Sequence, residues 1–377
     1  MALRPVRVIA ASLALFACLS VYAGAQESGE VAHDAEGNAI IAHTADPEQM
    51  RAVMMAAATK VIGPGYARFH AAGKQLATIT GSLCKTPGDA ALNAARAAFT
   101  ITALAWGKVE NIRFGPIMSD NRLERVLFWP DRKSIGLKQV QSLLVGKDPG
   151  ALDPRTLTGK SVALQGLGAL EFVLFGTGSQ ELAKGGEYRC AYALAIAGNL
   201  ATIGGELEAA WSRPEEVLSA WLREDDPDRA SEMLNELVGA LVHGLEATRD
   251  IRLRGFLGEE PDKDKPRVAL FRRSGNTIAM IAADIEGLRD LYAGSTMETL
   301  LPDDMRSIGE SMRFEFSQLI DIARHVSKPV DQAVADPDER QRLALLDIVM
   351  DSLIERIDTQ FAPATGLASG FSFSDGD

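Results

Sequence analysis

The stretch that decides the fold reads LQGLGALEFVLFG and runs from Leu164 to Gly176. It is apolar almost throughout, and Glu171 is the only charged side chain between Ser161 and Gln180. At helical spacing, apolar residues surround Glu171 on all sides, which predicts a helix buried in the core. An ionised carboxylate in that position is costly without a partner. We therefore expect Glu171 to meet a cation of the protein, a metal or a ligand.

Two glycines precede Glu171 on this predicted helix. Gly166 and Gly168 each cost about 1 kcal/mol of helix stability relative to alanine. Such glycines are tolerated where another helix or a ligand approaches the backbone closely. Close packing of a neighbouring helix is the preferred interpretation.

The remainder of the chain carries helical patterns. Leu92, Phe99 and Trp106 recur every seven residues and predict a stripe that faces the core. The segments are rich in Ala and Leu, and no hairpin signal or alternating strand pattern stands out among them, so the predicted fold is all-α. Beyond residue 150, helices are predicted at about 155–176, 184–212, 228–254, 276–293, 303–328 and 337–360.

A weak internal repeat indicates two similar halves. Residues 111–115 (NIRFG), a charged loop and residues 126–129 (VLFW) resemble residues 250–256 (DIRLRGF), a second charged loop and residues 268–271 (VALF). Duplication of a helical bundle with an irregular insert would produce this pattern, and chance similarity is the alternative. The predicted organisation is a signal peptide at 1–25, a flexible N-terminal segment at 26–45, and helical-bundle domains at 46–190 and 191–377.

The N-terminus has the pattern of a secretory signal. Two arginines precede an apolar run at residues 8–19 and a small-residue cleavage site that ends at Ala25. Residues 15–18 (LFAC) also resemble a lipoprotein box, which would place a lipid anchor on Cys18, but Phe16 is bulky for that position. Both interpretations predict an exported protein, either periplasmic or anchored to a membrane of the cell envelope.

The net charge of the chain argues against two classes of binding partner. Cleavage after Ala25 removes two arginines and no acid, which changes the formal net charge from −12 to −14. Such an acidic protein is not expected to bind nucleic acid or an anionic membrane surface. No later stretch reaches about 18 uncharged apolar residues, so no transmembrane span is expected in the mature chain.

The mature chain keeps two cysteines, Cys84 and Cys190. In an oxidising compartment an even pair is most simply a disulfide, here between the end of an early helix and the start of a later one. A cysteine metal site is the alternative, although no Cys-x-x-Cys or Cys/His spacing supports it.

Arg113 and the histidines are further candidates for chemistry. Arg113 directly precedes Phe114-Gly115-Pro116, where a helix must end, and a structural role at that helix end is the preferred interpretation. The functional alternative pairs Arg113 with Glu171 or with an acidic ligand. No His-x-x-His or HExxH pair is present, so a helix-borne zinc site is poorly supported.

Together these features resemble the imelysin family of exported bacterial proteins, also called imelysin peptidases. The matching pieces, in chain order, are SLCKTPGDAALNAARAAFTITALAWGKVENIRFGP, FWPDRK, LQGLGALEFVLFG, EYRCAYALA and GLASGFSFSDGD. The resemblance implies two helical domains that arose by duplication and a connection with iron or haem acquisition. The family signature G-x-H-x-x-E, which implies a metal or active site near the domain interface, aligns with Gly166 to Glu171, and Gly168 replaces its histidine.

The replacement weakens the peptidase interpretation, because glycine offers neither a metal ligand nor a base one turn before Glu171. The preferred hypothesis is a non-enzymatic binding protein for iron-related uptake, with partners among the iron- or haem-uptake components of the envelope. One alternative is a metallopeptidase that uses Glu171, the best candidate ligand if iron or another divalent metal binds. A structural or partner-binding lipoprotein is the third possibility. The candidate ligand-binding residues are Glu171, Gly166, Gly168, Arg113, Trp129 and Asp131.

Overall fold

The structure is a computed structural model that describes residues 45–222, 228–368 and 370. Side-chain caps mark where several of its helices begin. Asp46 accepts a hydrogen bond from the Glu48 amide (3.2 Å), and Asp336 accepts from the amides of Asp338 and Glu339 (both 3.1 Å). These bonds satisfy amides that the first turn of a helix leaves without an acceptor.

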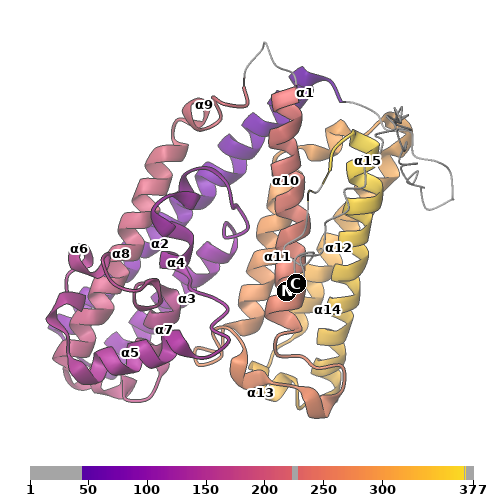
Figure 1. The fold of residues 1–377 in the computed structure, drawn as a ribbon. Helices are drawn as coiled ribbons and strands as arrows, with labels where there is room; N and C mark the ends of the chain where they lie inside the picture. Colours follow the sequence, from indigo (N-terminus) through magenta and orange to yellow (C-terminus); the bar gives the residue numbers. More distant parts are fainter. Residues whose placement is uncertain (1–44, 223–227, 369, 371–377) are drawn as a thin grey trace, which may run out of the picture. The chain divides into compact units, whose positions relative to one another are not determined.

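All regular secondary structure of the described residues is helical (Figure 1), which confirms the predicted all-α class. Three π-helical segments, Ala57–Ile62, Ala247–Leu253 and Ile357–Phe361, continue α1, α10 and α14. The α-helices are α1 (Pro47–Ala56), α2 (Gly63–Lys85), α3 (Asp89–Gly107), α4 (Arg122–Val126), α5 (Ile135–Gly146), α6 (Pro154–Leu157), α7 (Leu167–Phe175), α8 (Glu187–Trp211), α9 (Pro214–Val217), α10 (Asp228–Glu246), α11 (Thr277–Gly294), α12 (Arg306–His325), α13 (Val330–Ala333), α14 (Pro337–Arg356) and α15 (Ala362–Thr365).

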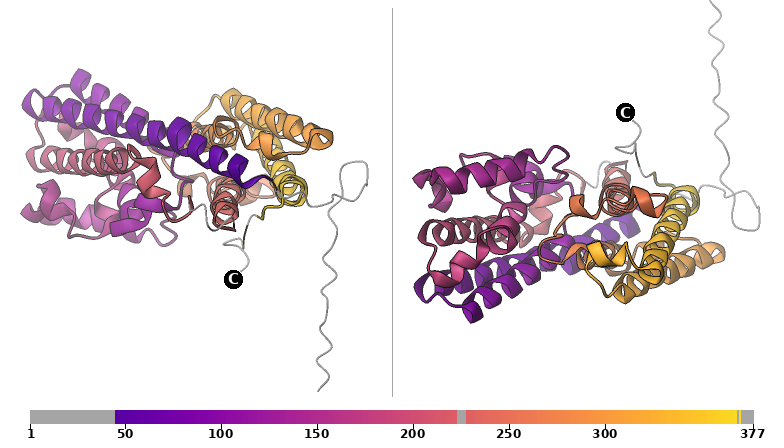
Figure 2. Two further views of the ribbon diagram at one scale, coloured as in Figure 1. Left: turned by 90° about the horizontal axis from the view of Figure 1, so that it is seen from above. Right: turned by 90° about the horizontal axis from the view of Figure 1, so that it is seen from below.

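The longer helices form two groups. In the first, α2 packs along α8 and α3, and α7 lies against α3 and α8; in the second, α11 and α14 pack on α12, and α10 on α11 and α14. Contacts of α3 with α11 and of α1 with α10 join the groups, and Figure 2 shows α1 and α2 running from one group to the other. The predicted boundary at residue 190 falls in the first turn of α8, and the division into duplicated domains stays a prediction.

The core passes from one group into the other. Leu92, Phe99 and Trp106 are buried, as their spacing predicts. Trp106 packs on Phe69 of α2 with ring centroids 5.3 Å apart, and Phe99 meets Phe271, which precedes α11, edge to face at 5.5 Å. Aromatic contacts of this kind favour one arrangement of the two groups.

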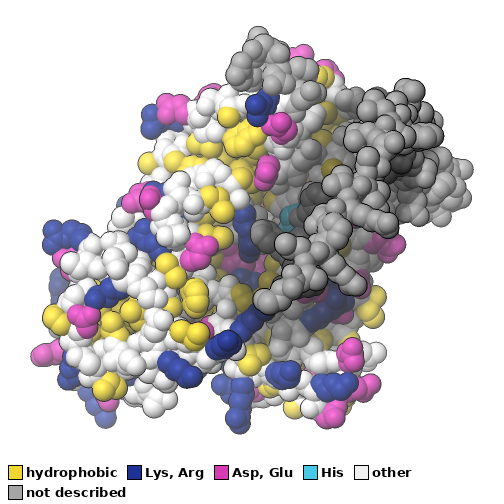
Figure 3. Space-filling view, viewed as in Figure 1, with side chains coloured by type: hydrophobic (Ala, Val, Ile, Leu, Met, Phe, Trp, Pro, Cys, Tyr) yellow, Lys and Arg dark blue, Asp and Glu magenta, His cyan; other side chains and the backbone are white. Residues whose placement is uncertain are grey.

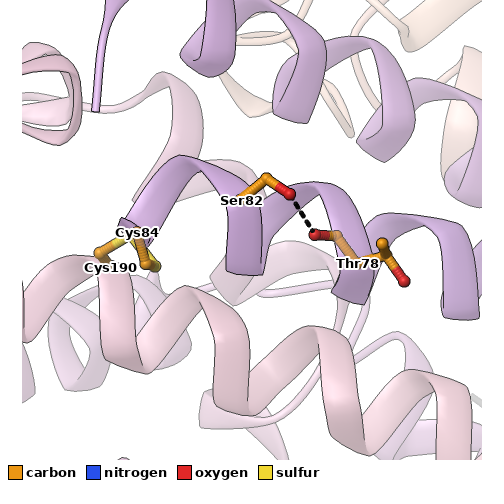
Figure 4. Close-up of a disulfide and its surroundings, with 4 residues drawn as sticks. All are labelled: Thr78, Ser82, Cys84 and Cys190. Atoms are coloured by element: carbon orange, nitrogen blue, oxygen red, sulfur yellow. Dashed lines mark hydrogen bonds between the residues drawn. A yellow bond between two sulfur atoms is a disulfide. The ribbon is translucent and has the colours of Figure 1, made fainter. Parts of the chain in front are cut away.

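Cys84 and Cys190 form the predicted disulfide (Figure 4). It joins the end of α2 to the first turn of α8, with 5.6 Å between the two Cα atoms. The bond closes a loop of 106 residues, for which the chain-entropy estimate of stabilisation is about 4–5 kcal/mol. It holds together the two helices that carry most of the packing in the first group.

One predicted helix is broken in the structure. In place of a single helix at about 155–176, the chain forms α6, a short 3-10 turn at Val162–Leu164 and then α7. The break falls at Gly166, which is extended (φ −116°, ψ −166°) and lies against the end of α4. A β-carbon on Gly166 would lie 2.3 Å from the Val126 carbonyl oxygen, so close backbone approach requires glycine here.

Among the described residues, only α8 has the length and apolar composition of a membrane span. The same composition suits a core helix, and 61% of its most apolar window is buried inside the protein. The predicted signal peptide and the cysteine of the lipoprotein box lie outside the described residues.

Candidate functional site

Helix α7 carries Glu171 into the interior, as the apolar pattern predicts. Every residue of α7 from Ala169 to Leu174 is buried, and Glu171 is 5% exposed. Gly168 is the exception, because it is exposed in the first turn of the helix. The helix is therefore closed on most sides and open at one point near its N-terminus.

The partner of Glu171 comes from the segment that precedes α11. The Ser274 amide donates a hydrogen bond to Glu171 Oε1 (2.9 Å), and the Ser274 hydroxyl lies within hydrogen-bond distance of both Glu171 Oε1 (3.1 Å) and the Phe271 carbonyl oxygen (3.0 Å). Arg273 adds a distant ion pair, with 3.8 Å between its Nη1 and Glu171 Oε2. Protein groups of the second helix group thus meet Glu171, and the Ser274 amide supplies a charge-assisted hydrogen bond to its carboxylate.

Opposing effects act on the pKa of Glu171. Burial raises it, and the hydrogen bonds from Ser274 together with the Arg273 charge lower it. The net direction is upward, because burial has the largest effect. The carboxyl group is therefore easier to protonate than an exposed glutamate.

Glu171 lies at the wall of a cavity of about 520 Å³, a size that suits small-molecule ligands. Its walls come from residues 128–140, which include the start of α5, from residues 162–172 and from residues 250–273. Five of the six predicted ligand-binding residues line it: Glu171, Gly166, Gly168, Trp129 and Asp131.

Arg113, the sixth candidate, lies elsewhere. It lines a different cavity, and its charge acts on Asp284 of α11. Helix α3 ends at Gly107 with Lys108 as its C-cap, so the prediction that Arg113 stands at the end of this helix is wrong. The cation nearest Glu171 is Arg273, which the sequence did not single out.

Asp131 has a structural task in the cavity wall. Its two carboxylate oxygens accept hydrogen bonds from the amides of Gly136 (3.2 Å) and Leu137 (3.0 Å), at the start of α5. This is the arrangement of a helix cap and uses the acceptors of the side chain. Trp129 is partly buried against the core beside it and forms a cis peptide bond with Pro130.

The two glycines before Glu171 differ in what surrounds them. Gly166 touches the backbone of Arg125 and Val126, which confirms close packing as the reason for that glycine. Nothing lies within 4 Å of a β-carbon built on Gly168, so the prediction of close packing is wrong for this glycine. The position where the family signature has histidine therefore borders open space in this chain, and the glycine enlarges the cavity.

Four cations in the cavity wall were not predicted as site residues. Arg132 follows Asp131, whereas Lys265, Arg267 and Arg273 belong to the stretch between α10 and α11. Lys265 and Arg267 lie in the second charged loop of the internal repeat, which served only as evidence of duplication, whereas Arg132 and Arg273 lie outside that loop.

The donor atoms near Glu171 do not suit a resident metal ion. No cluster of three or more His, Cys, Asp or Glu side chains able to hold a metal occurs in the part of the chain that the structure describes. Divalent ions in proteins take several such ligands, and Glu171 supplies one carboxylate that Ser274 already engages. Metal binding by Glu171 stays a prediction that this donor set does not favour.

A second buried charge cluster lies between α3 and α11. Arg252 pairs with Glu110, and its Nε lies 3.0 Å from Asp284 Oδ2. Glu110 is 5% exposed and Asp284 is fully buried. Burial, followed by the charge of Glu110, raises the pKa of Asp284 above its usual range. In the internal repeat Arg252 corresponds to Arg113, yet the sequence gave no sign of the pairing.

Comparison with protein families places the chain. The model of the imelysin family matches residues 62–359. The chain belongs to the imelysin family. A crystal structure of an imelysin-like protein from Psychrobacter arcticum 273-4 is similar, with a TM-score of 0.72 and 20% identity over 87% of this chain and 100% of that one. Comparison with curated proteins found no match.

A second solved structure has the same fold. It is a protein named as an iron-regulated protein A precursor, from Parabacteroides distasonis ATCC 8503. The TM-score is 0.66 with 11% identity, over 84% of this chain and 95% of that chain. At these identities both structures support the imelysin fold and leave the ligand of this family member to be argued from its own cavity.

Proposed function

We propose that this imelysin-family protein is an exported, non-enzymatic binding protein that acts in iron-related uptake at the cell envelope. The observation that carries the proposal is the cavity beside Glu171, whose walls come from both halves of the chain. The name of the Parabacteroides structure supports the connection with iron. The partners would be iron- or haem-uptake components of the envelope.

The surroundings of Glu171 favour binding over hydrolysis. A hydrolytic base needs a water within reach, activated by a metal or by a second group. Here the Ser274 amide donates to the carboxylate, the Ser274 hydroxyl lies 3.1 Å from the same oxygen, and position 168 carries no side chain that could hold a metal or a proton. Glu171 is better placed to fix the geometry of the wall than to take a proton from water.

A peptidase is the second candidate, favoured by the raised pKa of Glu171, which moves the group toward the range of a general base. Purified protein would be assayed for cleavage of casein beside its Glu171→Gln variant. We expect no cleavage by either protein. Cleavage by the wild type that Glu171→Gln abolishes would replace the binding proposal with the peptidase.

Filling the cavity tests the binding proposal directly. Gly168→Trp places an indole in open space at the wall, and Gly146→Trp, at an exposed end of α5 with nothing within 4 Å, is the matched control. Thermal shift with ferric citrate, haemin and a ferric trihydroxamate measures binding through the rise in Tm. We expect at least one compound to stabilise the wild type and the Gly146→Trp variant, and Gly168→Trp to lose the shift. No shift with any compound would reject the proposal.

A further inference from the structure

The charges around the cavity do not balance locally. Three acids line it, and each is engaged by protein groups: Asp131 caps α5, Glu171 binds Ser274, and Asp250 pairs with Arg249 (2.8 Å) and Arg254 (3.0 Å). Each of the three carboxylates already has a donor from the protein, so none of them is free to pair with a cationic ligand.

The cations of the same wall are in the opposite situation. The side chains of Arg132, Lys265 and Arg267 are exposed and form no ion pair or hydrogen bond with any residue that the structure describes. Arg273 lies over the Phe172 ring at 5.4 Å and keeps only the 3.8 Å contact with Glu171. Figure 3 shows Lys and Arg side chains gathered between α5 and α13, in the lower centre of that face. The whole chain has a net charge of −12, whereas the unpaired cations make the electrostatic potential at this cavity positive.

The start of α7 adds to this positive field. The helix has no side-chain cap, and the amides of Gly168 and Ala169, which both line the cavity, have no acceptor among the described residues. Free amides at a helix N-terminus favour an anion. Because Gly168 has no side chain, a ligand can approach these amides without obstruction.

From these observations we infer that the cavity binds a small polycarboxylate anion, and that iron enters it as a ferric polycarboxylate complex rather than as a bare ion. The inference rests on the proposed function, whose ligand class it specifies. A bare ion needs several protein donors, which this wall lacks. In a chelate, the polycarboxylate supplies the ligands of the metal ion. Its remaining carboxylate oxygens face Arg132, Lys265 and Arg267. Phe172 and Trp129 supply the apolar part of the wall.

The test compares two double variants that remove the same charge. Lys265→Gln with Arg267→Gln removes two cations of the cavity; Lys74→Gln with Lys138→Gln removes two exposed lysines that do not line it. Isothermal titration with ferric citrate and with metal-free citrate gives Kd for each protein. We expect the cavity variant to weaken ferric citrate binding about tenfold or more, and the control to change Kd by less than about twofold. Binding of metal-free citrate would show that the protein recognises the carboxylate groups of the ligand and does not require the iron.

Two outcomes overturn the inference in different ways. An unchanged Kd in the cavity double variant, with unfolding midpoints equal to wild type, shows that these cations do not recognise the ligand. Binding of the uncharged ferric trihydroxamate but not of ferric citrate, lost in Gly168→Trp, rejects the anion and keeps the proposed function. If no iron compound binds, the proposed function itself fails.

Discussion

Two buried carboxylates, Glu171 and Asp284, differ in their surroundings. Glu171 stands at the wall of a cavity, held by Ser274 and only loosely by Arg273. Asp284 is enclosed on all sides, and Arg252 bridges it to Glu110. Burial raises the pKa of both carboxyl groups. A shifted pKa therefore does not by itself separate a candidate binding site from a structural ion-pair cluster, because burial shifts the pKa in both.

The enclosed cluster gives the largest expected effect. Arg252→Ala would leave Glu110 and Asp284 buried together without their shared cation. Breaking a buried ion pair in this way costs about 3–5 kcal/mol, because a charge remains uncompensated. Urea unfolding at neutral pH measures the loss, and Arg252→Lys, which keeps the charge, should recover part of it. A loss below about 1 kcal/mol would show that the cluster does not hold the two halves together.

Substitutions at Gly166, just before α7, and at Gly168, in its first turn, should change stability by intermediate amounts and in opposite directions. Gly166→Ala forces a β-carbon against the Val126 carbonyl and should destabilise the protein by about 1–3 kcal/mol. Gly168→Ala meets open space and should leave stability unchanged or raise it by up to about 1 kcal/mol. The urea unfolding midpoints of the two variants, compared with that of the wild type, measure these changes in stability. Equal losses would mean that α7 is packed as tightly at the cavity as at α4.

The pH dependence of Glu171 gives the smallest effect. Since its folded pKa is raised, the folded state binds a proton more tightly than the unfolded state, and this contribution to stability is present at low pH. It is lost as pH rises above the unfolded value of about 4.3 toward the folded pKa. Glu171→Gln removes the titration, so the stability of wild type relative to the variant should fall with rising pH.

Unfolding of both proteins in urea at several pH values from about 4 to 7 measures this difference. Asp284 titrates in the same direction in both proteins, so its contribution cancels in the comparison. A difference that stays constant with pH would show that Glu171 has an ordinary pKa and is better hydrated than its burial indicates.

The sequence predicted the all-α class, the burial of Glu171 and the disulfide because each has a local or pairwise signal. An apolar surround at helical spacing indicates burial, and two cysteines allow one pairing. The cluster of Arg252, Glu110 and Asp284 had no such signal. Its members are separated by up to 174 positions in the chain. A charged residue without a nearby partner in the sequence is usually predicted to be exposed to solvent.

Position 166 shows the same limit within the predicted site. Both glycines before Glu171 looked alike in the sequence, since propensity assigns them the same cost. The contact that separates them comes from the end of α4, some forty residues earlier in the chain. The sequence offered Arg113 only as an alternative partner of Glu171, and the structure places Arg273 beside Glu171 instead. A helix-end pattern locates a cation along the chain, but it does not show which residues lie near that cation in space.

The amino-acid sequence by itself determined the helical class and the placement of one acid inside an apolar helix, because both follow from residue spacing within a segment. It also indicated the family, through motifs that occur in the same order along the chain. Tertiary structure alone decided which groups meet that acid, which glycine borders open space and which cations share the cavity. Those features depend on segments far apart in the chain, and their positions are set by packing of the whole core.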